Sequence, residues 1–325
     1  MTKIKNYFQI DSELLKYISL LISLLWVSTF FFVIFVDFTI IQNQMKKWIL
    51  PAVLFLFIQA EAQNAGQVKY PLTTVTDVAG VSVLNILDAY LSPLTYSGLG
   101  VFVEHKEQKL FSPENTNLSM QGRLSALAGM TINPKSTSSI TYFGGRYSWG
   151  AFYKFNITDD MQLFAGSTAD AGLAVKENGR NINNPYNFDV ATNLNLSAVA
   201  NYNISLNRRV LRLNCEIEAP VLGCMFVPEA GISYYQIYEL KNFTNTVHFS
   251  SLHNKLGISI NAGVEIPFNS STLKMGIGVN NLKYTANDMV FRLNNYNLFF
   301  GWNYNLYRFR GTKNRAPENF VSVGN

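Results

Sequence analysis

The chain of 325 residues is poor in the residue types that build metal and redox sites, with only two cysteines and three histidines. These residues are scattered and do not have the spacing of a zinc site, so we expect neither a metal nor another cofactor. The net charge of +5 is not gathered into a basic cluster or stripe, which argues against a nucleic-acid partner. After Gln63 no uninterrupted apolar run approaches the roughly 18 residues that a membrane-spanning helix needs.

Residues 45–62 read MKKWILPAVLFLFIQAEA and contain the ordered parts of a secretory signal peptide. Two lysines precede an apolar run, and the segment ends in a small-x-small site at Ala62, followed by Gln63. We therefore expect Sec-type export with cleavage between Ala62 and Gln63. An ordinary buried helix beginning at Met45 is the alternative.

A second apolar segment precedes this one at residues 18–41 and contains Asp37 as its only charged residue. It is long enough to cross a bilayer as a helix. Residues 1–44 are therefore either a transmembrane segment or a doubtful upstream extension, translated from a start codon placed too early. A cleavage site so close behind a true anchor would be redundant, which favours the extension. The mature chain would then begin at Gln63 and have 325 − 62 = 263 residues.

Apolar and polar residues alternate with period two over residues 188–207, 256–268 and 296–306. Such long alternating segments are typical of tilted strands that cross a membrane with one face toward lipid. Weaker copies occur at residues 99–105, 118–130, 140–155, 161–175, 211–217 and 273–279.

These nine segments predict an all-β protein, an antiparallel transmembrane outer-membrane β-barrel. Since bacterial single-chain barrels have an even number of strands, a tenth strand is expected at residues 79–90 or 231–240. Ten strands are favoured and twelve are possible. A soluble β-sandwich is the alternative, but it requires shorter strands and would leave the polar face outside.

The connections divide into short and long ones, as in outer-membrane barrels, whose short turns are periplasmic. Short polar joints are expected at residues 158–160, 207–209 and 269–271, and longer loops at residues 177–187, 219–254 and 286–294. The predicted organisation is an N-terminal segment at residues 63–96, the barrel at residues 97–310 and a C-terminal tail at residues 311–325.

In each strand the polar residues occupy every second position, and the charged residues at these positions should point into the lumen. The predicted network consists of Glu104, Arg123, Arg212, Glu265 and Lys274, accompanied by Lys154, Asp170 and Glu216. Arg146 joins them only if a β-bulge at Gly144-Gly145 changes the parity of its strand. In a barrel of about ten strands side chains fill most of the lumen, so these charges should neutralise one another and leave no wide channel.

Cys215 and Cys224 are the only cysteines. An oxidising periplasm would permit a disulfide between them. The alternation nevertheless places Cys215 on the lipid face, and Cys224 lies beyond the end of the strand. Their side chains should therefore diverge, which argues against the bond.

Residues 219–255 are rich in aromatic residues and too apolar to remain free in water. This segment is expected to form a lid over the barrel mouth or a binding site for a lipid, a glycan or an envelope protein. Tyr234, Tyr235, His248 and His253 are the candidate binding residues. If the segment is a strand, Tyr234 and Tyr235 lie on opposite faces, one inward and one outward.

The run APVLGCMFVPEAGISYYQIYEL, followed by VHFSSLHNK, resembles the central motif of a domain-of-unknown-function family of Bacteroidota outer-membrane proteins. In that motif P-L-L-G-x-M-F-x-P leads to S-Y-Y-E-I and then to H-F-x-S-x-H-N, so Gln236 stands where an acid is expected. The segment ILDAYLSPLTYSG is similar to that family's opening. The resemblance implies a barrel in the cell envelope and supplies no catalytic residues.

The sequence therefore predicts a non-catalytic barrel in the bacterial outer membrane with a binding or envelope-assembly role and with membrane lipid around it. A transport barrel that admits a small or apolar solute is the alternative. An outer-membrane acyl hydrolase is the third hypothesis, since His248 or His253 could activate a nearby serine.

Overall fold

The computed structural model describes residues 70–182, 184–206, 209–268, 271–306 and 320–323. The segments predicted as an upstream extension and a signal peptide, with the Ala62–Gln63 cleavage site, lie outside these residues. Within the described ranges, no helix is long and apolar enough to cross a membrane.

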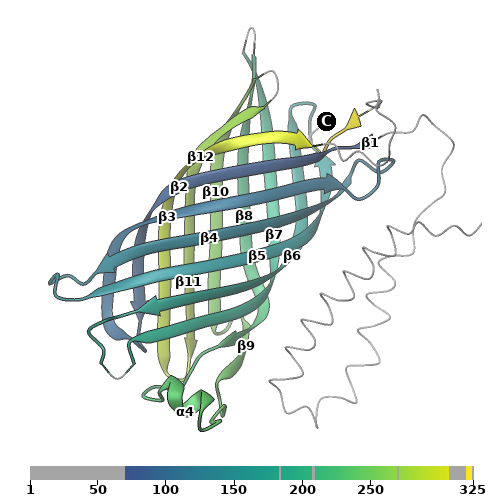
Figure 1. Ribbon diagram of the computed structural model, residues 1–325. Coiled ribbons are helices and arrows are strands. Elements are labelled where there is room, and N and C mark those ends of the chain that lie inside the picture. The colour runs from purple at the N-terminus through teal and green to yellow at the C-terminus, as the bar shows by residue number, and fades with distance from the viewer. Residues whose placement is uncertain (1–69, 183, 207–208, 269–270, 307–319, 324–325) are drawn as a thin grey trace, which may run out of the picture. The chain divides into compact units, whose positions relative to one another are not determined.

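Ten antiparallel strands form a closed barrel (Figure 1). Neighbouring strands follow the order β10-β11-β12-β2-β3-β4-β5-β6-β7-β8, and pairing of β8 with β10 closes the ring. The barrel strands are β2 (Thr73–Asp88), β3 (Ser92–Leu110), β4 (Leu118–Ile132), β5 (Ser139–Asn156), β6 (Met161–Glu177), β7 (Tyr186–Leu206), β8 (Arg209–Phe226), β10 (Lys255–Pro267), β11 (Thr272–Ala286) and β12 (Met289–Leu306).

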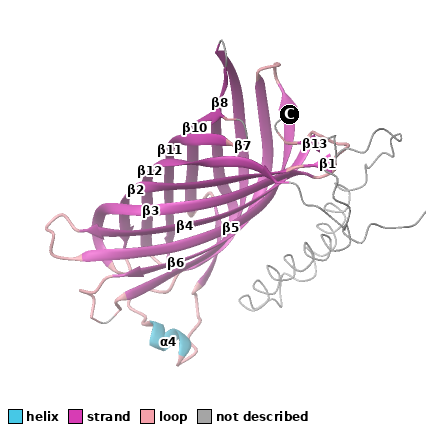
Figure 2. Ribbon diagram, turned by 45° about the horizontal axis from the view of Figure 1, so that its top comes forward, coloured by secondary structure: helices cyan, strands magenta, loops and turns pink. Residues whose placement is uncertain are grey.

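Three short strands and one helix complete the described structure. Strand β9 (Val247–Ser251) pairs with β8 outside the closed ring, and helix α4 (Tyr234–Tyr238) lies in the same connection. Figure 2 shows α4 beyond the end of the barrel. Strands β1 (Tyr70–Pro71) and β13 (Phe320–Val321) form a small parallel pair.

The predicted fold and the count of ten strands are confirmed. The tenth strand is β2, which overlaps residues 79–90, whereas the alternative at residues 231–240 is wrong because α4 occupies it. The barrel consequently begins at Thr73 and not at residue 97. The alternation of β2 is weak because Leu84 and Ile86 pack inside the barrel while Val81 and Val83 face outward, so both faces of this strand are apolar.

Side chains alternate between lumen and lipid as the sequence pattern predicts. Leu196 and Trp302 are 60% and 54% exposed on the outer surface, whereas Asn195, next to Leu196, is 1% exposed. A wall with apolar residues outside and polar residues inside is the arrangement of a barrel whose solvent is lipid.

The predicted bulge at Gly144-Gly145 is wrong, because β5 pairs in unbroken register with both of its neighbours. The parity changes for another reason: Ile140 and Tyr142 are apolar but point inward and are buried. The loop predicted at residues 286–294 is also absent. A two-residue turn joins β11 to β12, with Asn287 and Asp288 at φ values of 50° and 58° as a tight hairpin turn requires.

Both cysteines are free thiols. They lie on the same strand, β8, nine positions apart, which corresponds to about 30 Å in an extended chain. A disulfide between Cys215 and Cys224 within this fold is therefore excluded, because the two Cα atoms of a disulfide lie within about 7 Å of each other.

Strand β8 changes its partner along one edge. Its residues Arg212–Glu218 pair with Glu265–Ser259 of β10, and its residues Leu222–Phe226 pair with Ser251–Val247 of β9. Between the two ladders, residues 219–221 of β8 face residues 252–258 without register partners on that edge. We call this interruption of the wall the β8–β10 gap.

Candidate functional site

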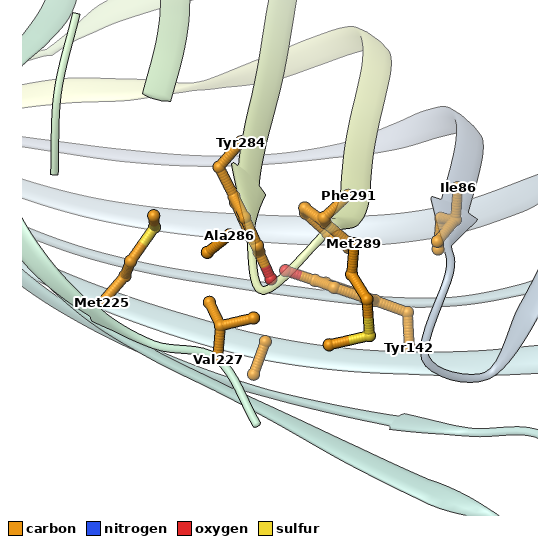
Figure 3. Packing of buried hydrophobic residues seen from close by; sticks show 9 residues of the cluster. Ile86, Tyr142, Met225, Val227, Tyr284, Ala286, Met289 and Phe291 are labelled. Atoms are coloured by element: carbon orange, nitrogen blue, oxygen red, sulfur yellow. The ribbon is translucent and has the colours of Figure 1, made fainter. Parts of the chain in front are cut away.

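An apolar cluster that we call the cap lies inside the lumen at the outer end of the barrel, where the longest connection lies (Figure 3). Strands from all around the ring contribute to it. Its buried members are Ile86, Tyr142, Ala174, Met225, Val227, Tyr284, Ala286, Met289 and Phe291.

A buried lysine lies within the cap. Lys176 Nζ is 2.5 Å from Asp88 Oδ2 and 2.7 Å from Asp189 Oδ2, and it lies 4.0 Å from the centre of the Phe291 ring. The Tyr284 hydroxyl donates to Asp189 at 2.9 Å. Burial of one cation with two carboxylates is tolerated only when hydrogen bonds satisfy the charges, as they do here. The sequence pattern did not single out Lys176, Asp88 or Asp189.

A belt of ion pairs crosses the middle of the lumen. Glu216 accepts from Arg123 and from Lys106, the latter at 3.2 Å, and Glu104 lies 3.7 Å from Arg123. Glu104 and Arg123 therefore both point inward, as predicted, and they contact each other from the neighbouring strands β3 and β4, whereas Glu216 reaches Arg123 from β8 across the lumen. Lys106 was missed, although it lies two positions from Glu104 and so shares its face.

Arg146 forms the second part of the belt. Its guanidinium contacts Glu218 at 2.6 Å and Asp170 at 3.8 Å. It faces inward without a bulge, since even-numbered residues of β5 point into the lumen throughout. Glu218 also accepts from the hydroxyls of Thr168 and Ser197, at 3.2 and 3.3 Å.

The remaining members of the predicted network lie toward the end of the barrel that carries the short turns. Lys274 is 3.3 Å from Glu265, as expected for a neutralised pair. Arg212 is different: its Nε donates to the Asn203 side chain at 3.1 Å, and no ion pair to it is recorded among the described side chains. Among the five predicted residues, Glu104 with Arg123 and Glu265 with Lys274 form two close pairs, and Lys274 also interacts electrostatically with Glu104.

Two cavities lie within the lumen. The outer cavity has a volume of about 300 Å³ and extends from the cap to the ion-pair belt. The inner cavity, of about 390 Å³, is lined by polar residues that include Arg212, Lys274 and Asn201. Val323, near the C-terminus, also lines the inner cavity and is buried in a small apolar cluster with Phe152 and Phe164.

The candidate binding residue Tyr234 fixes the outer connection to the barrel. Its hydroxyl donates to Asn187 at 2.7 Å and accepts from the backbone N–H of Phe188 at 2.8 Å. Its ring meets those of Phe188 and Tyr90, with centroids 5.1 and 5.9 Å away. Burial raises the pKa of Tyr234 above its ordinary value, and this effect outweighs the opposing effect of the Phe188 N–H bond, so the hydroxyl keeps its proton.

Tyr90 supports the same connection from the β2–β3 turn. Its hydroxyl donates to the carbonyl oxygen of Ile232 at 2.7 Å. Burial, with a smaller contribution from the negative charge of Asp88, raises the pKa of Tyr90 to about 12. The bond is therefore present at any physiological pH.

The local sequence explains why this piece is helical and not a strand. Ser233 and Gln236 form a capping box, in which Gln236 N donates to the Ser233 hydroxyl and Ser233 N donates to the Gln236 side chain at 2.9 Å. Gln236 thus completes the capping box of α4. Tyr234 and Tyr235 still diverge, since Tyr235 is 65% exposed.

Around Tyr235 the outer connection exposes further aromatic and apolar side chains. They are Tyr238, Leu240, Phe243, Phe249 and Leu252. The buried residues Ile237 and Thr246 hold the same segment in place from beneath. The connection is therefore an ordered surface with an apolar outer side.

The two candidate histidines lie on opposite sides of the β9 region. His253 is exposed, and its Nδ1 is 2.5 Å from the Ser251 hydroxyl. His248 lies on the inward face of β9, and its Nε2 is buried without a hydrogen-bond partner among the described residues. The structure therefore brings Ser251 and His253 together but does not bring the two histidines to one site.

Metal-binding potential was searched over the described ranges. They contain no group of three or more His, Cys, Asp or Glu side chains that could hold an ion.

A family model described as a protein of unknown function (DUF3316) matches residues 49–313. No curated protein matches the chain. Solved structures with similar folds include the translocator domain of the autotransporter NalP from Neisseria meningitidis, with 10% identity and a TM-score of 0.40 over 82% of this chain and 95% of that chain. The outer membrane protease OmpT from Escherichia coli is 7% identical, with a TM-score of 0.39 over 73% of this chain and 96% of that chain. Likenesses this distant carry no argument about function.

Proposed function

Because the chain belongs to the DUF3316 family of proteins of unknown function, we propose its role from its own geometry. We infer a non-catalytic outer-membrane barrel that binds another component of the cell envelope through residues 227–254, which we call the outer loop. The proposal includes the Sec-type export that the signal segment predicts and the Bacteroidota origin that the family resemblance implies.

The observation that carries this proposal is the contrast between Tyr234 and Tyr235. Tyr234 and Tyr90 fix the loop from below by hydrogen bonds to β7 and to the loop backbone. Tyr235 and its neighbours remain exposed on a surface that is held in one conformation. Rigid exposed aromatic residues are the usual anchors of binding surfaces, because little conformational entropy is lost when a partner covers them.

Photo-crosslinking in intact cells tests this role. A photoreactive phenylalanine analogue at position 235 should form one discrete crosslinked species, and Tyr238→Ala should abolish it. The same analogue at position 196, on the lipid-facing wall, is the matched control and should give no such species. Identical products from both positions would show that the loop only contacts lipid, and the proposed role would then fail.

A transport barrel is the second candidate, and the two lumen cavities favour it. The ion-pair belt separates them, so conduction requires the belt to rearrange. Planar-bilayer recordings of the purified protein separate the candidates: steady conductance that increases in Glu216→Gln supports transport, whereas its absence in both proteins contradicts it.

A further inference from the structure

The β8–β10 gap is the weakest part of the barrel wall. The β8–β10 ladder contains seven register pairs, whereas every other neighbouring pair in the ring has thirteen or more. Pro220 lies in the gap and has no N–H to donate. The register of β7 with β8 also shifts there, between Leu194 and Asn195.

The gap is closed by side-chain packing where hydrogen bonds are missing. The Pro220 ring lies over Gly257, so that a Cβ added at Gly257 would be 2.9 Å from Pro220 Cγ. On the opposite edge of β10, residues 255–258 are fully paired with β11. In a wall surrounded by lipid, unpaired backbone is tolerated only where protein covers it or where it lines a cavity.

The outer cavity reaches the gap, since Pro220, Gly257 and Lys255 belong to its lining. Its outer wall is the apolar cap, from which Tyr142, Met225, Tyr284 and Phe291 contribute. Its inner wall is the ion-pair belt. The cavity therefore has one apolar side and one polar side, which fits an amphipathic molecule.

Lys255 provides the polar contact beside the gap. It is 5% exposed, and its Nζ donates to the Asn193 side chain at 2.6 Å. Unlike Lys106, Lys176 and Lys274, it has no carboxylate within ion-pair distance among the described side chains. A buried ammonium with only an amide partner is costly, and an anionic group beside it would offset that cost.

We propose that the outer cavity is a binding site for a small amphipathic carboxylate, which reaches it laterally through the β8–β10 gap. The carboxylate binds Lys255, and the apolar body packs against Tyr142, Tyr284 and Phe291 of the cap. Access requires the register pairs next to the gap, beginning with Glu218 and Ser259, to separate. It also requires the Pro220 ring to move away from Gly257. This site is distinct from the outer loop, and it holds whether or not the loop binds a partner.

Calorimetry with 4-phenylbutyrate tests the site, using the full barrel in lipid nanodiscs. Lys255→Met should weaken 4-phenylbutyrate binding at least about 10-fold, the usual scale for a charge-assisted hydrogen bond. Binding of the uncharged analogue 4-phenylbutanol should not change. Lys283→Met, an exposed lysine on the neighbouring strand, is the matched control and should bind both compounds normally. Absence of 4-phenylbutyrate binding, or equal weakening for both compounds, would overturn the proposal.

A native cysteine makes the lateral route testable. Ala262 is the register partner of Cys215 across β8 and β10, and Ala200 is its partner across β7 and β8. In a Cys224→Ser background, oxidised Ala262→Cys should slow 4-phenylbutyrate association at least about 10-fold, and reduction should restore it, because the disulfide fastens the ladder that must open. Oxidised Ala200→Cys should associate at the normal rate. Equal rates in oxidised and reduced Ala262→Cys would refute lateral access.

Discussion

Tyr234 donates a hydrogen bond of 2.7 Å to Asn187, a residue 47 positions earlier in the chain, and this bond joins the outer loop to strand β7. Asn187 in turn donates to Asp88 at 2.8 Å, and Asp88 contacts Lys176. The loop is thus connected through three side chains to the buried lysine of the cap.

Removing the Tyr234 hydroxyl should loosen the loop without disturbing the barrel. Tyr234→Phe keeps the ring contacts but leaves Asn187 and the Phe188 N–H without their partner, which costs on the order of 1–3 kcal/mol. Protease added to intact cells should cleave within residues 230–249 faster than in the natural protein. Tyr235→Phe is the control and should be cleaved at the natural rate. Cleavage as fast in the natural protein as in Tyr234→Phe would contradict a fixed loop.

The ion-pair belt should be sensitive to the loss of its shared carboxylate. Glu216→Gln leaves Arg123 and Lys106 buried with one charge fewer between them, which should lower the free energy of unfolding by roughly 3–5 kcal/mol. Urea unfolding of the barrel refolded into lipid vesicles measures this. Glu107→Gln, on the exposed end of β3, should have little effect. A natural-like midpoint for Glu216→Gln would show that the belt does not support the barrel.

The two faces of the wall should respond differently to arginine. Ile260→Arg places a charge toward lipid and should cost about 2–4 kcal/mol near the bilayer midplane. Asn201→Arg should cost less, because Asn201 lines the inner cavity, where there is space and polar surroundings. Vesicle refolding yields and urea midpoints report both. Equal damage from the two substitutions would argue against a lipid-facing wall.

The start of the mature chain is a separate prediction from the sequence. Amino-terminal sequencing of protein extracted from membranes should begin at Gln63, or fail because Gln63 has cyclised to pyroglutamate. Mass spectrometry of the intact chain then distinguishes a blocked Gln63 from a longer product. A mature chain that retains residues 18–41 would refute the upstream-extension hypothesis.

The alternation of residues predicted nine strands and the inward position of Glu104, Arg123, Arg212, Glu265 and Lys274. Periodicity is reliable here because lipid outside and polar contacts inside impose opposite demands on neighbouring residues. It failed where the lumen itself becomes apolar. The apolar residue Tyr142 points inward to the cap, so the alternation in β5 wrongly predicted a bulge. Ile86 also points inward to the cap, so apolar residues lie on both faces of β2 and the alternation there is hidden.

The alternation could not predict which distant residues meet, for a different reason. A period of two assigns each side chain to a face but does not say which strand lies opposite, or at what register. Glu216 with Arg123, and Arg146 with Glu218, meet across the lumen only after the ring closes. The change of partner along β8 depends on the same closure.

The sequence by itself determined the barrel and most of the division of residues between lipid and lumen, because both follow from the local spacing of side chains in an extended chain. The count of ten strands also needed the rule that bacterial single-chain barrels have an even number of strands. Only the tertiary structure decided what the lumen contains. The cap, the buried Lys176, the contact of Lys255 with Asn193 and the β8–β10 gap arise where the ring closes and the outer loop packs back on the barrel mouth. Contacts between residues far apart in the chain create these features, and no local pattern encodes them.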